Sequence, residues 1–124
     1  MSNEKIARNL FNAFESGDMD AVRALCSADF KARQNLNTEF DLDTLIHFSQ
    51  AVSSVVNNFR YEDIRCSGTE DGFVEEHIVC GEFSDGTPLK LAACVVATIH
   101  EGKITHLCEY VDTAAASALS KALA

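Results

Sequence analysis

The sequence has few basic residues, because 10 Lys and Arg stand against 19 Asp and Glu, and the formal net charge at pH 7 is −9. Proteins that bind nucleic acid hold the phosphates with clustered Lys and Arg. Here the basic residues are scattered along the chain. The composition therefore argues against nucleic acid as a partner.

The sequence also lacks the patterns of a disulfide scaffold, a metal site and a membrane protein. Its cysteines number five with no C-x-x-C pair, and its four histidines have neither H-x-H nor H-x-x-x-H spacing. No apolar run approaches the ~20 residues of a membrane span, and the N-terminus has no apolar segment of a signal peptide. We therefore expect a cytoplasmic protein without membrane contact, metal or other cofactor.

What is present is the composition of one folded domain, with 124 residues of which 47% are hydrophobic. Apolar spacing and turn signals predict helices over 3–15, 19–26, 42–57 and 113–124, a short strand over 29–35, and strands over 59–67, 73–83, 89–100 and 104–112. Helices that precede an antiparallel sheet in this way are typical of the α+β class.

The last three strands are expected to form a meander with tight turns at Asp85-Gly86 and Glu101-Gly102. If each turn holds two residues, His77 lies opposite Cys94 and Cys94 lies opposite Glu109. Side chains alternate along a strand, so these three share one face of the sheet with apolar neighbours. We expect helices to cover this face and leave a ligand cavity.

The same register puts an apolar row on the opposite, outer face of the sheet: Leu91, Ala93, Val95, Ala97 and Ile99. An exposed patch of this size on a small protein usually marks an interface. We therefore expect a homodimer that packs through the outer sheet face.

Two segments resemble the nuclear transport factor 2-like superfamily. Residues 14–20 (FESGDMD), followed by 25–30, are similar to its opening. Residues 96–104, with 109–112 after them, are similar to the closing strands of its SnoaL-like branch. The resemblance covers residues 1–124 and implies a single SnoaL-like domain, a cystatin-like α+β cone with three N-terminal helices packed on a curved, mostly antiparallel sheet.

The superfamily includes isomerases, cyclases, hydratases, epoxide hydrolases and non-catalytic binders. Its ketosteroid isomerases need a Tyr, an Asp base and a protonated Asp. At those positions this chain has Leu10, Gln34 and a segment, 94–96, without a carboxylate. Steroid isomerase chemistry of that kind is therefore not expected. The catalytic aspartate of the SnoaL-like polyketide cyclases aligns with Glu109, and their sheet histidine aligns near Val95.

Register and resemblance together predict Glu109 as the catalytic acid/base and His77 as a polariser or second acid/base. Each has a purely structural alternative: Glu109 paired with an Arg, and His77 as a satisfied strand residue. Cys94 is more simply a packing residue than a nucleophile, since no cation beyond His77 is evident to activate it. The predicted ligand-binding residues are Phe14, Gln34, Val52, Cys94 and Leu107.

The leading hypothesis is thus a small-molecule pocket protein, and specifically an acid/base enzyme of the cyclase, isomerase or hydratase type. Its ligand would be a small, apolar carbonyl compound. The alternative is a non-catalytic ligand-binding or protein-interaction module, which the missing isomerase residues favour. A β-bulge near the Glu101-Gly102 turn would move Glu109 to the other face and remove the catalytic hypothesis.

Overall fold

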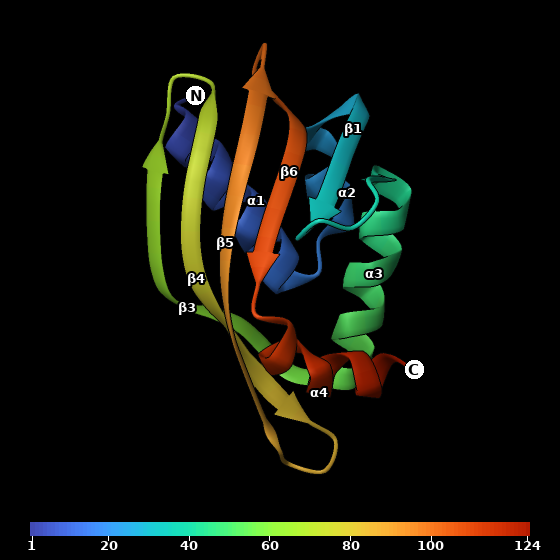
Figure 1. Cartoon of the computed structure of the whole chain (residues 1–124). Coiled ribbons are helices and arrows are strands. Elements are labelled where there is room, and N and C mark those ends of the chain that lie inside the picture. The colour runs from blue at the N-terminus through green and yellow to red at the C-terminus, as the bar shows by residue number, and fades with distance from the viewer.

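The computed structural model describes residues 1–124 as four helices and one six-stranded sheet (Figure 1). The helices are α1 (Asn3–Ser16), α2 (Met19–Leu25), α3 (Leu42–Val55) and α4 (Thr113–Leu123). The strands are β1 (Cys26–Gln34), β2 (Phe40–Asp41), β3 (Val56–Gly68), β4 (Gly72–Phe83), β5 (Pro88–His100) and β6 (Lys103–Val111). The predicted α+β class is confirmed, and only the short β2 has no counterpart in the prediction. None of the helices has the length and apolarity needed to cross a membrane.

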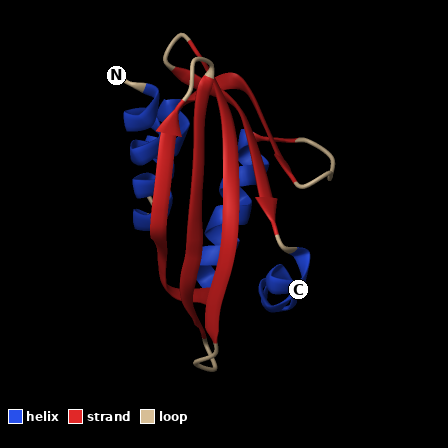
Figure 2. Cartoon of the chain, turned by 60° about the vertical axis from the view of Figure 1, so that its left-hand side comes forward, coloured by secondary structure: helices blue, strands red, loops and turns tan.

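The sheet runs in the order β2-β1-β6-β5-β4-β3, and every neighbouring pair is antiparallel except β1 and β6. In Figure 2 the long, curved strands stand in front and the helices α1 to α3 lie behind them, while α4 lies near the C-terminus at one end. We call the face covered by helices the inner face and the opposite one the outer face.

Helix α1 packs along the inner face because its apolar residues recur on one side. Ile6, Leu10 and Phe14 are all buried, as the spacing predicts. The helix begins at Ser2, whose hydroxyl accepts a hydrogen bond from the Lys5 amide. It ends at Gly17, whose φ of 75° lies in the left-handed region that glycine adopts without strain.

The turn between β4 and β5 is longer than predicted. Three residues, Ser84 to Gly86, form it, since Glu82 pairs with Pro88 and the Phe83 amide donates to the Thr87 carbonyl. Gly86 has a φ of 87°, which is typical of a three-residue hairpin that ends in a glycine bulge. His77 therefore lies opposite Ala93, and the predicted pairing with Cys94 is wrong.

The turn at Glu101-Gly102 holds two residues as predicted, but a bulge follows it. Thr98 pairs with His106 while Ile99 pairs with Ile104, so Thr105 is an extra residue in β6. Glu109 consequently lies opposite Val95 rather than Cys94. The two shifts cancel across the meander, so His77 and Glu109 still share one face.

Only in the middle strand β5 do the side chains lie on the opposite faces of the sheet from those predicted. Its apolar row lies on the inner face, where Leu91, Ala93, Val95 and Ala97 are between 3% and 5% exposed. The prediction that this row forms a dimer interface on the outer face is therefore wrong. Cys94 belongs to the outer face, together with Tyr110 directly opposite it on β6.

Candidate functional site

A cavity of about 240 Å³ lies between the inner sheet face and the helices. Most of the residues that line it are apolar: Phe11, Phe14, Ala32, Phe40, Leu45, Phe48, Val52, Phe59, Tyr61, Val79, Leu91, Val95, Leu107 and Leu119. The others are Arg33, Gln34, Thr44, Ser49 and Glu109. An apolar wall with a few polar groups is typical of a small-molecule site.

Glu109 is the carboxylate at this wall. It is half-buried, and its Oε1 accepts a hydrogen bond of 2.8 Å from the Nε2 of Gln34, which lies beside it in the parallel pair of β1 and β6. Asn35 fixes the adjoining backbone, because its amide donates to the Glu109 carbonyl and its Oδ1 accepts from the Val111 amide. The carboxylate is thus held in place by neutral groups, and no Arg or Lys pairs with it.

Tyr61 brings a second polar group to the cavity. Burial raises the pKa of its phenol well above the usual value, and the charges of Glu109, Glu75 and Glu15 raise it further. The side chain therefore stays protonated and able to donate. Its hydroxyl makes no hydrogen bond within the chain, so it is free to bind a ligand in the cavity that its side chain lines.

His77 lies behind the cavity wall rather than on it. Its side chain is 1% exposed, and its Nδ1 lies 2.7 Å from Oε2 of Glu75, which is also fully buried. The rings of Tyr61 and Phe11 cover the imidazole, with centroids 4.4 Å and 4.9 Å from its own. Its Nε2 is buried without a hydrogen-bond partner. The buried pair is therefore separated from a ligand by two aromatic rings.

The structure brings five of the predicted site residues to the cavity wall: Phe14, Gln34, Val52, Leu107 and Glu109. It does not bring His77 there, and the expected position of Cys94 in the cavity is wrong, because that residue lies on the outer face. Tyr61 was missed. The signal for it is the alternation of Phe59 and Tyr61 on one strand, which directs both aromatic side chains to the same face.

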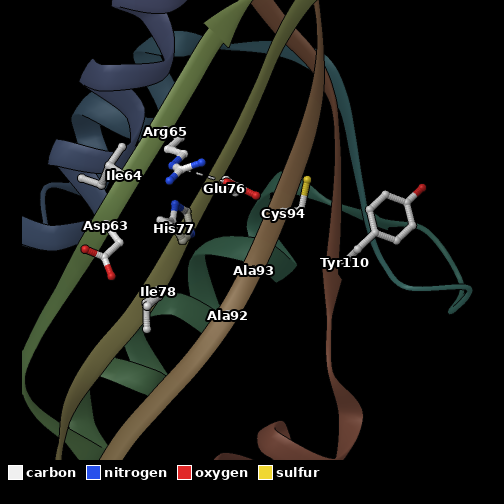
Figure 3. Close-up of a pocket in the computed structure, with 10 residues that line it drawn as sticks. All are labelled: Asp63, Ile64, Arg65, Glu76, His77, Ile78, Ala92, Ala93, Cys94 and Tyr110. Carbon is white, nitrogen blue, oxygen red and sulfur yellow. Dashed lines mark ion pairs between the residues drawn. The ribbon is translucent and has the colours of Figure 1, made fainter.

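A shallow groove of about 740 Å³ lies on the outer face (Figure 3). Among its lining residues are Asp63, Ile64, Arg65, Glu76, Cys94 and Tyr110. In Figure 3 Arg65 and Glu76 point toward one another, and their charged groups are 3.8 Å apart on an exposed surface. An exposed pair of this kind contributes little to stability. The groove has no buried carboxylate, so the inner cavity is the better candidate for chemistry.

The inner cavity therefore combines a proton acceptor, a neutral hydrogen-bond partner that orients it, and a protonated phenol, within mostly apolar walls. These groups suit acid/base chemistry on a compact molecule. No group of three or more His, Cys, Asp or Glu side chains lies close enough together to hold a metal ion.

Comparison with protein families gives a match of residues 7–107 to the SnoaL-like domain. Comparison with curated proteins gives no significant match. Among solved structures, a candidate polyketide cyclase from Pseudomonas putida is similar with 24% identity and a TM-score of 0.79, over 90% of this chain and 92% of that one.

Two further solved structures are similar at lower identity. An LEH-like epoxide hydrolase from M. tuberculosis has 17% identity and a TM-score of 0.76, over 98% of this chain and 88% of that one. An NTF2-like protein from Burkholderia xenovorans has 20% identity and a TM-score of 0.77, over 98% of this chain and 95% of that one. At these identities the likeness establishes a shared fold, and the chemistry must come from the residues of the cavity.

Proposed function

Because this chain belongs to the SnoaL-like domain family of the nuclear transport factor 2-like superfamily, we propose that it is a small-molecule enzyme that moves a proton on a compact, largely apolar carbonyl compound. The observation that carries the proposal is the carboxylate of Glu109 in a mostly apolar cavity, where its side chain is hydrogen-bonded only to a neutral amide. The reaction is of the cyclase, isomerase or hydratase type and needs no cofactor.

Each polar group of the cavity has a role in this reaction. Gln34 engages one oxygen of Glu109, which leaves the other free to take a proton from a carbon next to the carbonyl. The electron pair of the broken C–H bond moves to the carbonyl oxygen, and Tyr61 donates a hydrogen bond to the resulting oxyanion. Glu109 then returns the proton to the substrate. Tyr61 takes the polarising role that the sequence assigned to His77, since His77 lies behind the wall.

Deuterium exchange tests the proposal without knowledge of the natural substrate. Compact ketones such as cyclohexanone and acetophenone are incubated with the protein in D₂O, and loss of the C–H signals next to the carbonyl is followed by proton NMR. We expect the protein to accelerate exchange, and E109Q to reduce the acceleration by about 10²-fold or more. The matched control is E70Q, which removes the same charge at an exposed turn and should leave exchange unchanged.

If E109Q exchanges the ketones as fast as the native protein, the acid/base proposal is wrong. Binding of ketones without any exchange would favour the alternative, a non-catalytic ligand-binding module.

We also propose a homodimer that packs through the outer sheet face, for a different reason from the one that the sequence suggested. Four of the large apolar residues that are exposed lie on this side: Ile64, Val74, Val96 and Tyr110, between 36% and 42% exposed. Exposed apolar residues that gather on one sheet face support association. Light scattering after gel filtration should give twice the chain mass, and V96E should give the mass of one chain. A native protein that stays monomeric at all concentrations would contradict this.

The cytoplasm is the compartment that we propose, because all five cysteines have free thiols. Cys94 and Cys108 lie on neighbouring strands of the outer face, where an oxidising compartment would expose them to disulfide exchange. Mass spectrometry of protein trapped with a thiol reagent in intact cells should find five reduced cysteines.

A further inference from the structure

The cavity is lined by six aromatic side chains: Phe11, Phe14, Phe40, Phe48, Phe59 and Tyr61. Around Tyr61 the rings meet edge to face, with Phe11 at 5.4 Å and 80° and Phe59 at 5.3 Å and 81°. The face of an aromatic ring carries partial negative charge, so rings in this number favour a positively charged group close to them.

The charge in the cavity is of one sign. Glu109 is the one acidic residue among those that line it, and its side chain is bound only by the neutral amide of Gln34. Arg33 is the one basic residue, but its guanidinium points toward Cys108 and the Tyr110 hydroxyl, which belong to the outer face. Inside the cavity the carboxylate therefore has no positive partner.

A half-buried carboxylate that no cation of the chain pairs with attracts a positively charged ligand, because the two charges interact more strongly inside the cavity than in water. A neutral ligand lacks this attraction, and an anion would be repelled by Glu109 and by the overall charge of −9. The volume of about 240 Å³ limits the ligand to a compact molecule.

We propose that the cavity binds a compact organic cation, an alkylated ammonium compound whose charge lies near Glu109 and whose apolar groups lie against the aromatic side chains. The inference uses the same cavity as the proposed function but does not depend on proton transfer. The two are compatible in one substrate, because a positive charge near a carbonyl makes the adjacent C–H more acidic.

Two probes of the same size and shape test the charge alone: (3-hydroxyphenyl)trimethylammonium and its neutral analogue 3-tert-butylphenol. Their dissociation constants are measured at neutral pH by NMR titration of the labelled full chain. We expect the ammonium probe to bind about tenfold more tightly than the phenol. E109Q should remove most of this preference, whereas the control E70Q should retain it.

Equal affinities for the two probes in the native protein, or binding of neither, would overturn the inference, as would an E109Q variant that keeps the full preference. The comparison of probes in the native protein decides the matter even if E109Q fails to fold. Ketone exchange is measured separately. If the protein accelerates ketone exchange but shows no preference for the cation, the proposed function stands and this inference is wrong. If it prefers the cation but does not accelerate exchange, this inference stands and the proposed function is wrong.

Discussion

Two carboxylates lie in one row across the inner sheet face, since Glu75 and Glu109 are both opposite Val95. Their strands are two apart, which separates the backbones by roughly 10 Å. Glu75 is 2% exposed and pairs with His77. Glu109 is half-buried, accepts a hydrogen bond from Gln34 and borders the cavity.

What differs between the two carboxylates is the layer above them. Phe11 and Tyr61 lie over the imidazole that pairs with Glu75, so that pair does not line the inner cavity. Over Glu109 the helices leave a space. Two identical groups on one sheet face thus have different surroundings because of where the aromatic side chains pack, and we propose that only Glu109 takes part in chemistry.

The largest effect should come from breaking the buried pair. H77F keeps a ring under Tyr61 but leaves Glu75 as an unpaired buried carboxylate, so we expect the free energy of unfolding to fall by about 3–5 kcal/mol. Urea unfolding measures this. The double variant E75L/H77F replaces both polar side chains with apolar ones and should recover most of the loss, because a buried polar pair often contributes no more to stability than an apolar pair of similar volume. A double variant less stable than H77F would show that the pair itself stabilises the fold.

A smaller effect is expected from Tyr61, which lies between the two regions. Y61F keeps the ring that covers His77, and the lost hydroxyl has no partner in the chain, so the free energy of unfolding should change by less than about 1 kcal/mol. Ketone exchange should slow by about 10²-fold, because one donor to the oxyanion is removed. Unfolding and exchange are measured on the same preparation. If Y61F exchanges ketones as fast as the native protein, Tyr61 only covers the buried pair and does not donate to the oxyanion.

The smallest effect concerns an exposed carboxylate that serves as a reference for the other two. Asp41 caps α3, and the hydrogen bond from the Thr44 amide holds the pKa of its carboxyl below the usual value. Its contribution is therefore present above the ordinary pKa of about 3.9 and is lost as the pH falls through the lower folded value. D41N keeps a capping side chain without the charge. Urea midpoints between about pH 5 and pH 2 should fall slightly more in the native protein than in D41N, and parallel curves would contradict this.

The order of elements, the caps and the inner face of β4 were predictable from the sequence, because they depend on local spacing. The face of β5 was not. Asp85-Gly86 suits a two-residue turn and equally the end of the three-residue turn that forms, and the two differ by one residue of register. The bulge at Thr105 has no local signature either, and it restored Glu109 to the predicted face only because the first shift was also present.

The candidate site was predictable in part for the same reason. Glu109 follows from its strand position together with the resemblance, and Gln34 from the resemblance, whereas the covering of His77 depends on how α1 packs Phe11 across the sheet. Tyr61 lies on β3, whose pairing with β4 shifts between Glu62 and Arg65, where Asp63 has a φ of 51°. Alternation puts Phe59 and Tyr61 on a common face of β3, but across that irregularity periodicity alone does not determine whether this face or the other one reaches the cavity.

The most direct test of the account compares ketone exchange by E109Q and by E75L/H77F in one experiment, with the native protein as reference. We expect E75L/H77F, once shown to be folded, to keep exchange within a few-fold of the native rate, and E109Q to lose about 10²-fold or more. The opposite result, with exchange lost in E75L/H77F and kept in E109Q, would place the chemistry at the buried pair and contradict the account.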